Sequence, residues 1–182
     1  MKRKLVLFVL VPFILASCSS SKTYFTSDIR ARVEASHQPL DKIQFYADRD
    51  IVLRRDIDKA EAMVASGKVK IENGHYVNII TLKKGTPGVC VMAKGNAICI
   101  SFEQGSDKFL TFGKTKLAGP DDPYRILAND WVEDYGTVMY EGKEFHIQPE
   151  GGEASIMIKS SVLKKSVVEE REMKGRKVAS NN

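Results

Sequence analysis

The sequence predicts a mostly β, antiparallel domain, and three observations support this fold class. Apolar residues alternate with polar ones in several short runs, tight-turn dipeptides separate these runs, and helical periodicity is confined to a short segment near residue 30. This pattern is typical of about eight or nine strands in a hairpin meander, closed as a small barrel or folded as a sandwich, with a short N-terminal helix.

The first expected element is a helix over residues 28–35. Ser27 can cap its N-terminus, Asp28 lies in its first turn, and Ile29 and Val33 lie four residues apart on one face. Pro39 ends this segment.

Alternating strands begin near residue 42. Ile43, Phe45 and Ala47 alternate before the turn at residues 48–50, and Ile51 and Leu53 alternate after it. Residues 59–65 form at most one or two helical turns.

The clearest hairpin spans residues 68–82 around Asn73-Gly74, because a type I′ turn needs positive φ at both central positions. Glu72 then lies opposite His75. That register places four apolar side chains on one face, namely Val69, Ile71, Tyr76 and Ile80.

Further turns are expected at Thr86-Pro87-Gly88, at Gly95-Asn96 and at residues 104–107, joining strands over 89–93, 97–102 and 109–112. Glu141-Gly142 closes another hairpin, and a last strand covers residues 155–158. The inward face of the sheet is expected to be bulky and to contain Val69, Ile71, Tyr76, Val138, Phe145 and Ile147.

An acidic segment, residues 119–134, holds the only tryptophan, Trp131. Its carboxylates could bind calcium while the tryptophan stacks on a sugar, but calcium loops place acids at alternate positions around a glycine and this segment does not. We favour a solvated loop with Trp131 packed into the core.

The N-terminus has the pattern of an export signal. Lys2, Arg3 and Lys4 precede an apolar run over residues 5–14, which is about half the 20 or so residues that a membrane span needs. Pro12 also argues against a stable core helix here.

Directly after this run, Leu15-Ala16-Ser17-Cys18 resembles the lipobox of bacterial lipoproteins. The resemblance covers residues 1–18 only, and the mature domain resembles no family. It implies cleavage before Cys18, removal of residues 1–17 and acylation of Cys18, so that several acyl chains hold the protein to a membrane. In that family Ser19, rather than Asp, after the cysteine favours the outer membrane over the inner one.

The mature chain divides into a lipidated tether (18–27), a single β-rich domain (28–160) and a basic C-terminal segment (161–182) that is either a helix or an extended tail. Cleavage removes three of the 28 basic residues and leaves 25 against 23 acidic ones. Such a balanced charge gives no reason to expect a nucleic-acid partner. Contact of the tail with anionic envelope surfaces is one interpretation, and simple solvation, with interleaved acids, is the favoured one.

We find no catalytic or metal-binding pattern in the sequence. His37, His75, His146, Cys90 and Cys99 lack the close spacing of zinc ligands, and phosphate-loop, dinucleotide and nucleophile-elbow motifs are missing. Ser161 and Lys164 have the Ser-x-x-Lys spacing of penicillin-recognising enzymes without their companion motifs. We therefore expect no cofactor, no metal and no enzymatic activity.

Export permits a disulfide between Cys90 and Cys99. A two-residue Gly95-Asn96 turn pairs Cys90 with Ser101 and leaves the two cysteines as diagonal neighbours, at or beyond bonding range. A four-residue loop would pair them directly, and a three-residue loop would send them to opposite faces. The Gly-Asn turn favours two free thiols.

Together these observations predict a lipid-anchored lipoprotein of the cell envelope that acts as a non-catalytic binding or structural interaction module, with an envelope protein or polymer as its partner. The alternatives are a carrier of small apolar ligands in a β-barrel and a hydrolase of envelope polymers.

Overall fold

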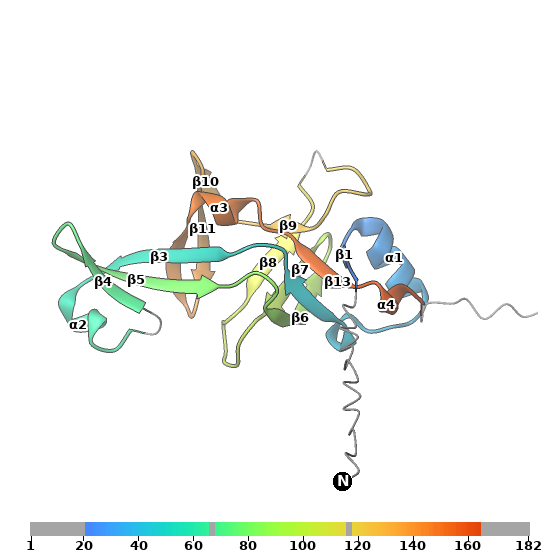
Figure 1. Ribbon diagram of the computed structural model, residues 1–182, viewed down its shortest axis with the longest axis horizontal. Coiled ribbons are helices and arrows are strands. Elements are labelled where there is room, and N and C mark those ends of the chain that lie inside the picture. The colour runs from blue at the N-terminus through green and yellow to red at the C-terminus, as the bar shows by residue number, and fades with distance from the viewer. Residues whose placement is uncertain (1–20, 66–67, 116–117, 165–182) are drawn as a thin grey trace, which may run out of the picture.

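The computed structural model describes residues 21–65, 68–115 and 118–164, which form two antiparallel sheets (Figure 1). The seven-stranded sheet contains, in spatial order, β1 (Lys22–Tyr24), β13 (Ile156–Lys159), β2 (Gln44–Ala47), β6 (Pro87–Lys94), β7 (Ala97–Ser101), β8 (Leu110–Gly113) and β9 (Arg125–Ile126). The six-stranded sheet contains β10 (Asp130–Val132), β11 (Tyr135–Tyr140), β12 (Lys143–Ile147), β3 (Ile51–Ile57), β5 (His75–Leu82) and β4 (Lys68–Glu72). The helices are α1 (Ser27–Ala35), the 3-10 helix η1 (Leu40–Lys42), α2 (Lys59–Ala62), α3 (Pro149–Gly152) and α4 (Ser161–Lys164).

The predicted mostly β, antiparallel class is therefore confirmed, in its sandwich form, because each sheet ends in two edge strands instead of closing into a barrel. Hairpins account for part of the pairing. Other neighbours are distant in sequence: β1 pairs with β13, β13 with β2, and β12 with β3. More strands are present than the eight or nine expected, since β1, β9 and β10 are only two or three residues long.

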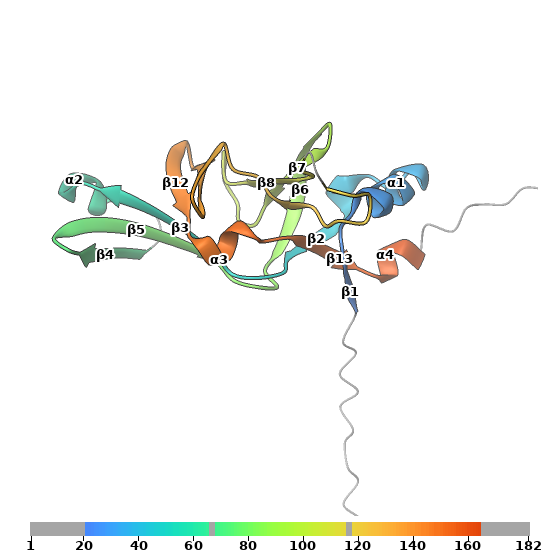
Figure 2. The same ribbon diagram turned by 90° about the horizontal axis from the view of Figure 1, so that it is seen from above.

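Within the described residues the chain passes between the sheets four times, from β2 to β3, from β5 to β6, from β9 to β10 and from β12 to β13. Figure 1 shows β3, β4 and β5 extending with α2 as an arm from the body of the molecule, while β10 and β11 run across their direction. Viewed from above, the arm again projects from one end, and α1 and α4 lie together at the other (Figure 2). The six-stranded sheet thus bends sharply between β12 and β3.

The core lies between the two sheets and α1. The predicted alternation is confirmed at Ile43, Phe45, Ala47, Ile51 and Leu53, all of which are buried. The partner sheet contributes Val138, Phe145 and Ile147 of the predicted inward face, which are buried together with Tyr140.

The start of the domain differs from the prediction that residues 18–27 form a tether. β1 pairs with β13, and Phe25 is fully buried, with its ring edge-on to the rings of Phe45 and Tyr124 at 5.1 and 5.2 Å. β1 and Phe25 therefore belong to the β-rich domain and not to a tether. The sequence did not predict this strand because the segment is mostly polar, and Phe25, the residue that directly follows the strand, is the one that faces the core.

Helix α1 confirms the predicted segment, with one correction at its cap. Thr26, not Ser27, is the N-cap residue, and its hydroxyl accepts a hydrogen bond from the backbone N–H of Ile29 at 3.2 Å. Ser27 is the first helical residue. Ile29 and Val33 are buried on the same face, as expected.

The two hairpins predicted from Asn73-Gly74 and Glu141-Gly142 are confirmed, and all four residues have positive φ. The turn predicted at Thr86-Pro87-Gly88 is wrong. Pro87 begins β6, where a missing N–H is tolerated, and the chain reverses earlier at Gly85, whose φ is +80°.

At the C-terminal end, α4 packs against α1, and Val162 and Leu163 contact the core. The first turn of the predicted basic segment therefore belongs to the domain. Residues 165–182, and the predicted lipidation residue Cys18, lie outside the described residues.

Candidate functional site

A concave site lies where β3 and β12 part. The two strands are paired at only two positions, Arg54 with His146 and Leu53 with Ile147. Beyond these two positions, β3 stays paired with β5 and extends into the arm, whereas β12 is paired only with β11. The opening between them is a groove of about 870 Å³.

The groove is lined by polar and charged side chains from several strands. Most of them alternate with the buried residues of the six-stranded sheet and so occupy its outer face. The lining comprises Arg54, Arg55, Asp56, Val132, Glu133, Tyr135, Thr137, Lys143, Glu144, His146 and Gln148.

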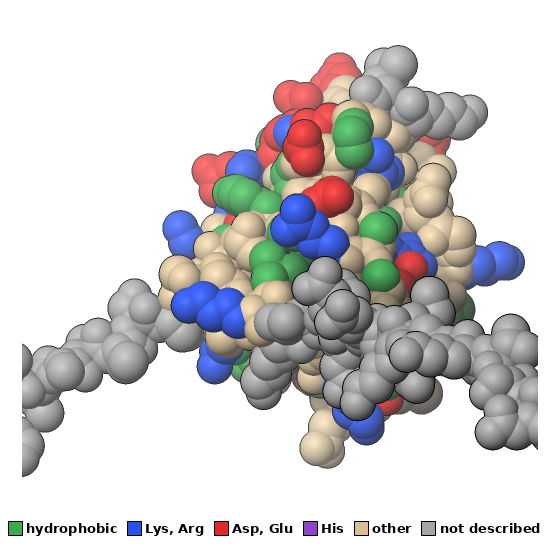
Figure 3. Space-filling model, turned by 90° about the vertical axis from the view of Figure 1, so that its right-hand side faces the viewer, with side chains coloured by type: hydrophobic (Ala, Val, Ile, Leu, Met, Phe, Trp, Pro, Cys, Tyr) green, Lys and Arg blue, Asp and Glu red, His purple; other side chains and the backbone are tan. Residues whose placement is uncertain are grey.

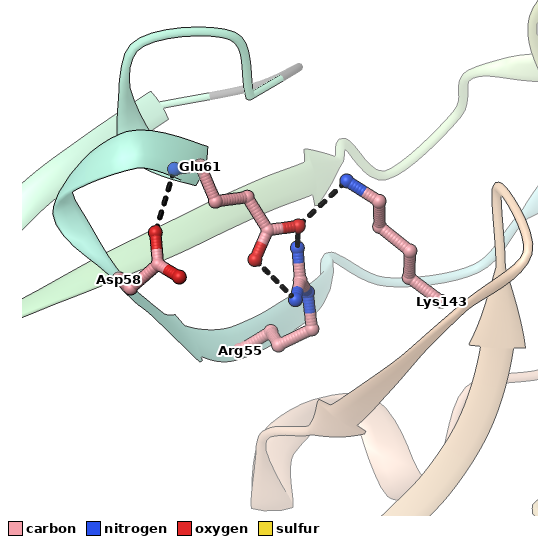
Figure 4. Close-up of polar contacts among 4 residues, drawn as sticks. All are labelled: Arg55, Asp58, Glu61 and Lys143. Atoms are coloured by element: carbon pink, nitrogen blue, oxygen red, sulfur yellow. Dashed lines mark hydrogen bonds and ion pairs between the residues drawn. The ribbon is translucent and has the colours of Figure 1, made fainter.

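A three-residue ion cluster closes one side of the groove (Figure 4). The Arg55 guanidinium donates two hydrogen bonds to the carboxylate of Glu61, one of them at 2.9 Å, and Lys143 Nζ donates a third at 2.7 Å. Hydrogen bonds from Arg55 and then from Lys143 lower the pKa of Glu61 to about 2. Glu61 is therefore ionised at neutral pH and links the arm to β12.

Local structure fixes the position of Glu61. Asp58 is the N-cap residue of α2, and its carboxylate accepts a hydrogen bond from the Glu61 backbone N–H at 2.7 Å (Figure 4). This short helix was predicted as one or two turns near residue 59. Its function here is to direct Glu61 towards Arg55.

Arg55 has an unusual environment for a charged residue. It occupies the core-side register of β3, in line with Ile51 and Leu53, and its guanidinium lies 5.4 Å from the centre of the Phe145 ring. Its Nε is buried without a hydrogen-bond partner, as is Oδ1 of Asn78, the residue paired with Arg55 on β5. Both atoms belong to the arm at the point where the sheet bends.

The remaining cations of the groove are also matched by carboxylates. Arg54 forms an ion pair with Glu72 at 2.6 Å, and Asp56, Glu133 and Glu144 supply further negative charge to the lining. Oγ1 of Thr137 lies 3.5 Å from Nδ1 of His146. Because both signs of charge are present and largely balanced, the groove suits a polar partner better than a strongly anionic one.

Of the three histidines considered in the sequence analysis, His37 and His75 lie away from this groove. His75 lies opposite Glu72 at the tip of the β4–β5 hairpin, as predicted, and His37 follows α1 with a φ of +53°. His146 is on the exposed side of β12, also as predicted, but the sequence did not show that it borders a groove. Among the described residues, no cluster of three potential metal ligands occurs.

Cys90 and Cys99 are both free thiols in the structure. The turn at Gly95-Asn96 pairs Lys94 with Ala97 as expected, but a β-bulge between Cys90 and Met92 shifts the register, so that Cys90 pairs with Ile100 and not with Ser101. Burial raises the pKa of the Cys90 thiol. Neither cysteine lines the groove.

The prediction that Trp131 packs into the core is wrong. Its side chain is 42% exposed, and it packs at the surface against Gly136 and Gly152, where an added Cβ would lie about 2.9 Å from its ring. The acidic segment around it is correspondingly more ordered than a loop and includes β9 and β10.

Sequence reasoning did not single out Arg54, Arg55, Glu61 or Lys143. One signal was available: Arg55 interrupts the apolar alternation of Ile51, Leu53 and Ile57 on β3. A charged residue at such a position needs a nearby partner. That partner, Glu61, lies six residues away in α2, whereas Lys143 comes from the distant strand β12 and could not be identified from local sequence.

Comparison of the chain with protein-family models, curated proteins and solved structures gives no significant match. Across the part of the chain that the structure describes, none of the helices has the length and apolar character needed to cross a membrane.

Proposed function

We propose that this chain is a lipid-anchored lipoprotein of the cell envelope and acts as a non-catalytic binding module. The lipobox-like residues 15–18 support the anchor, with Cys18 as the acylated residue and the outer membrane as the favoured location. The partner is an envelope protein or polymer that engages the groove between β3 and β12.

The observation that carries the binding role is the construction of the groove. Its polar groups project from strands and are held in place by ion pairs, as in Arg55–Glu61–Lys143 and Arg54–Glu72. A site assembled on strands with pre-positioned hydrogen-bond donors and acceptors suffers little loss of conformational entropy when a partner binds.

The carrier alternative has less support. It requires an apolar cavity inside a closed barrel, whereas the two sheets form an open sandwich whose interior is filled by side chains such as Phe45, Phe112 and Phe145.

Hydrolysis of an envelope polymer is the second candidate, because Asp56, Glu133 and Glu144 all line the groove. Glycoside hydrolysis generally needs a pair of carboxyl groups on either side of the scissile bond. Release of soluble fragments from purified peptidoglycan, lost in Glu133→Gln or Glu144→Gln, would favour this activity over the non-catalytic role.

The binding role can be tested by photo-crosslinking in cells. A benzophenone side chain in place of Tyr135, which lines the groove, should give a discrete adduct, whereas the same group at Tyr76, on the other face of that sheet, should not. Glu144→Lys should abolish the adduct, and Asp121→Lys, an exposed acid outside the groove, should leave it unchanged. Equal crosslinking at both tyrosines would contradict a groove-specific partner.

The anchor is tested separately by Cys18→Ala. Because the acyl chains are the proposed membrane attachment, this variant should accumulate as an uncleaved or soluble form. Mass spectrometry of membrane fractions measures the modification directly. An unmodified Cys18 in a stably membrane-bound protein would rule out the lipoprotein assignment.

A further inference from the structure

The outer face of the seven-stranded sheet differs from the groove in composition. Alternation with the buried Phe45, Ala47, Ile156 and Ile158 defines this face. We call the part of this face near the N-terminus the β1 face, and it comprises Lys22, Tyr24, Gln44, Tyr46, Pro87, Val89, Met157 and Lys159, of which Tyr46 and Met157 are only partly exposed.

The β1 face is apolar and aromatic with a basic rim. Tyr24 and Val89 are 47% and 45% exposed, and Lys22 Nζ lies 4.4 Å from the centre of the Tyr46 ring. No Asp or Glu occupies an outer-face position on the described strands of this sheet. Exposed aromatic rings beside lysines are the side chains enriched at membrane–water interfaces, and lysines there favour anionic lipid.

The surface charge is not uniform at this end of the molecule. In the view onto the end that holds α1 and α4, most acidic side chains gather towards the top of the domain, while Lys and Arg are interspersed with apolar side chains below them (Figure 3).

The short link between Cys18 and β1 indicates which surface covers the β1 face. Only residues 19–21 separate Cys18 from Lys22, so even a fully extended link reaches about 14 Å. Acyl chains on Cys18 would therefore hold β1, the edge strand of the seven-stranded sheet, close to the lipid headgroups. A link of this length leaves no room for another protein between that edge and the membrane.

We infer that the β1 face docks on the anionic phospholipid surface that carries the anchor, with Tyr24 and Tyr46 at the headgroup level and Lys22 and Lys159 facing lipid phosphates. This inference rests on the proposed lipidation of Cys18. Docking fixes the orientation of the domain and leaves the groove, which is on the other sheet, open to a partner.

The test uses the full lipidated protein in vesicles of phosphatidylethanolamine and phosphatidylglycerol, some containing brominated acyl chains that quench tryptophan. Wild-type protein reports on its native Trp131, which lies on the six-stranded sheet, and should be neither quenched nor shifted. Tyr24→Trp in a Trp131→Phe background should be strongly quenched, with emission shifted to the blue. Lys22→Glu with Lys159→Glu should reduce this quenching, and the matched reversals Lys68→Glu with Lys70→Glu on β4 should not.

The outcomes separate the two proposals. Protein that carries acylated Cys18 and floats with vesicles, yet shows no quenching of the Tyr24→Trp variant, overturns docking and leaves the anchor intact. Quenching of Trp131 equal to that of the variant also overturns it. Protein that lacks acyl chains and does not float overturns the proposed anchor and docking with it.

A measurement without substitutions guards against misfolded variants. Lys22, Lys159, Lys68 and Lys70 are all exposed in the structure, so a water-soluble acylating reagent should label them comparably in the absence of a membrane. In vesicles, Lys22 and Lys159 should be labelled less than Lys68 and Lys70. Equal labelling of all four in vesicles contradicts docking of the β1 face.

Discussion

Phe145 and Ile71, which lie on the same face of the six-stranded sheet, provide a direct test of how far along the sheet this face is buried. The sequence places both side chains on the inward face, whereas in the structure Phe145 is fully buried and Ile71, on the arm, is 67% exposed. The two substitutions Phe145→Ala and Ile71→Ala should therefore have very different effects on the free energy of unfolding.

The magnitude for Phe145→Ala follows from what the ring contacts. It packs edge-on against Tyr140 at 6.4 Å between centroids, and the Arg55 guanidinium lies 5.4 Å from its centre. Truncating a fully buried phenylalanine costs about 3–5 kcal/mol, and the two ring contacts place this site towards the upper end. An exposed side chain such as Ile71 should change stability by no more than about 0.5 kcal/mol.

Urea unfolding followed by circular dichroism measures both values from the shift in midpoint at constant slope. Phe145→Leu serves as a control, because it keeps most of the buried volume and should cost less than the alanine substitution. A loss for Ile71→Ala equal to that for Phe145→Ala would mean that the arm packs against the body, and would refute this description of the core.

Three further predictions concern single residues. Gly74→Val places a β-branched residue at a φ of +82° and should lower stability by about 1–3 kcal/mol, measured as a fall in melting temperature. Gly88→Ala should cost about 1–3 kcal/mol in urea unfolding, because its Cβ would lie 2.6 Å from a side-chain carbon of Ile100, and an unchanged midpoint would contradict this packing. Because the pKa of Glu61 is lowered from 4.5 to about 2, its contribution to stability is present above about pH 4.5 and is lost as the pH falls towards 2. Glu61→Gln should flatten the pH dependence of the urea midpoint over this range, and identical curves for the two proteins would show that Glu61 does not stabilise the fold.

Local signals predicted much of the fold. The hairpins at Asn73-Gly74 and Glu141-Gly142 need only a dipeptide that accepts positive φ and two flanking alternating runs, so the sequence is sufficient to place them. The buried alternation of Ile43, Phe45 and Ala47 is local in the same sense.

Other features depended on contacts that sequence periodicity does not encode. The strand β1 needed β13 as its partner, and the bulge before Met92 changed a register that turn length alone had set. Ile71 has the alternation expected of a buried residue. It lies, however, on the arm of the six-stranded sheet that extends beyond the seven-stranded sheet, so none of the described residues covers it.

The groove itself could not have been predicted, because it exists only where two strands distant in sequence separate. The direction in which the arm leaves the seven-stranded sheet depends on contacts at two of the crossings between the sheets. Asp50 accepts hydrogen bonds from Lys83 Nζ at 2.7 Å and from the Lys84 backbone N–H at 2.8 Å, and the Gly85 N–H donates to the Ala47 carbonyl at 2.8 Å. These bonds join the β2–β3 crossing to the β5–β6 crossing, so the arm leaves the seven-stranded sheet in a fixed direction. If the β1 face rests on a membrane, the same bonds determine where the groove, and any partner bound in it, stands relative to that membrane.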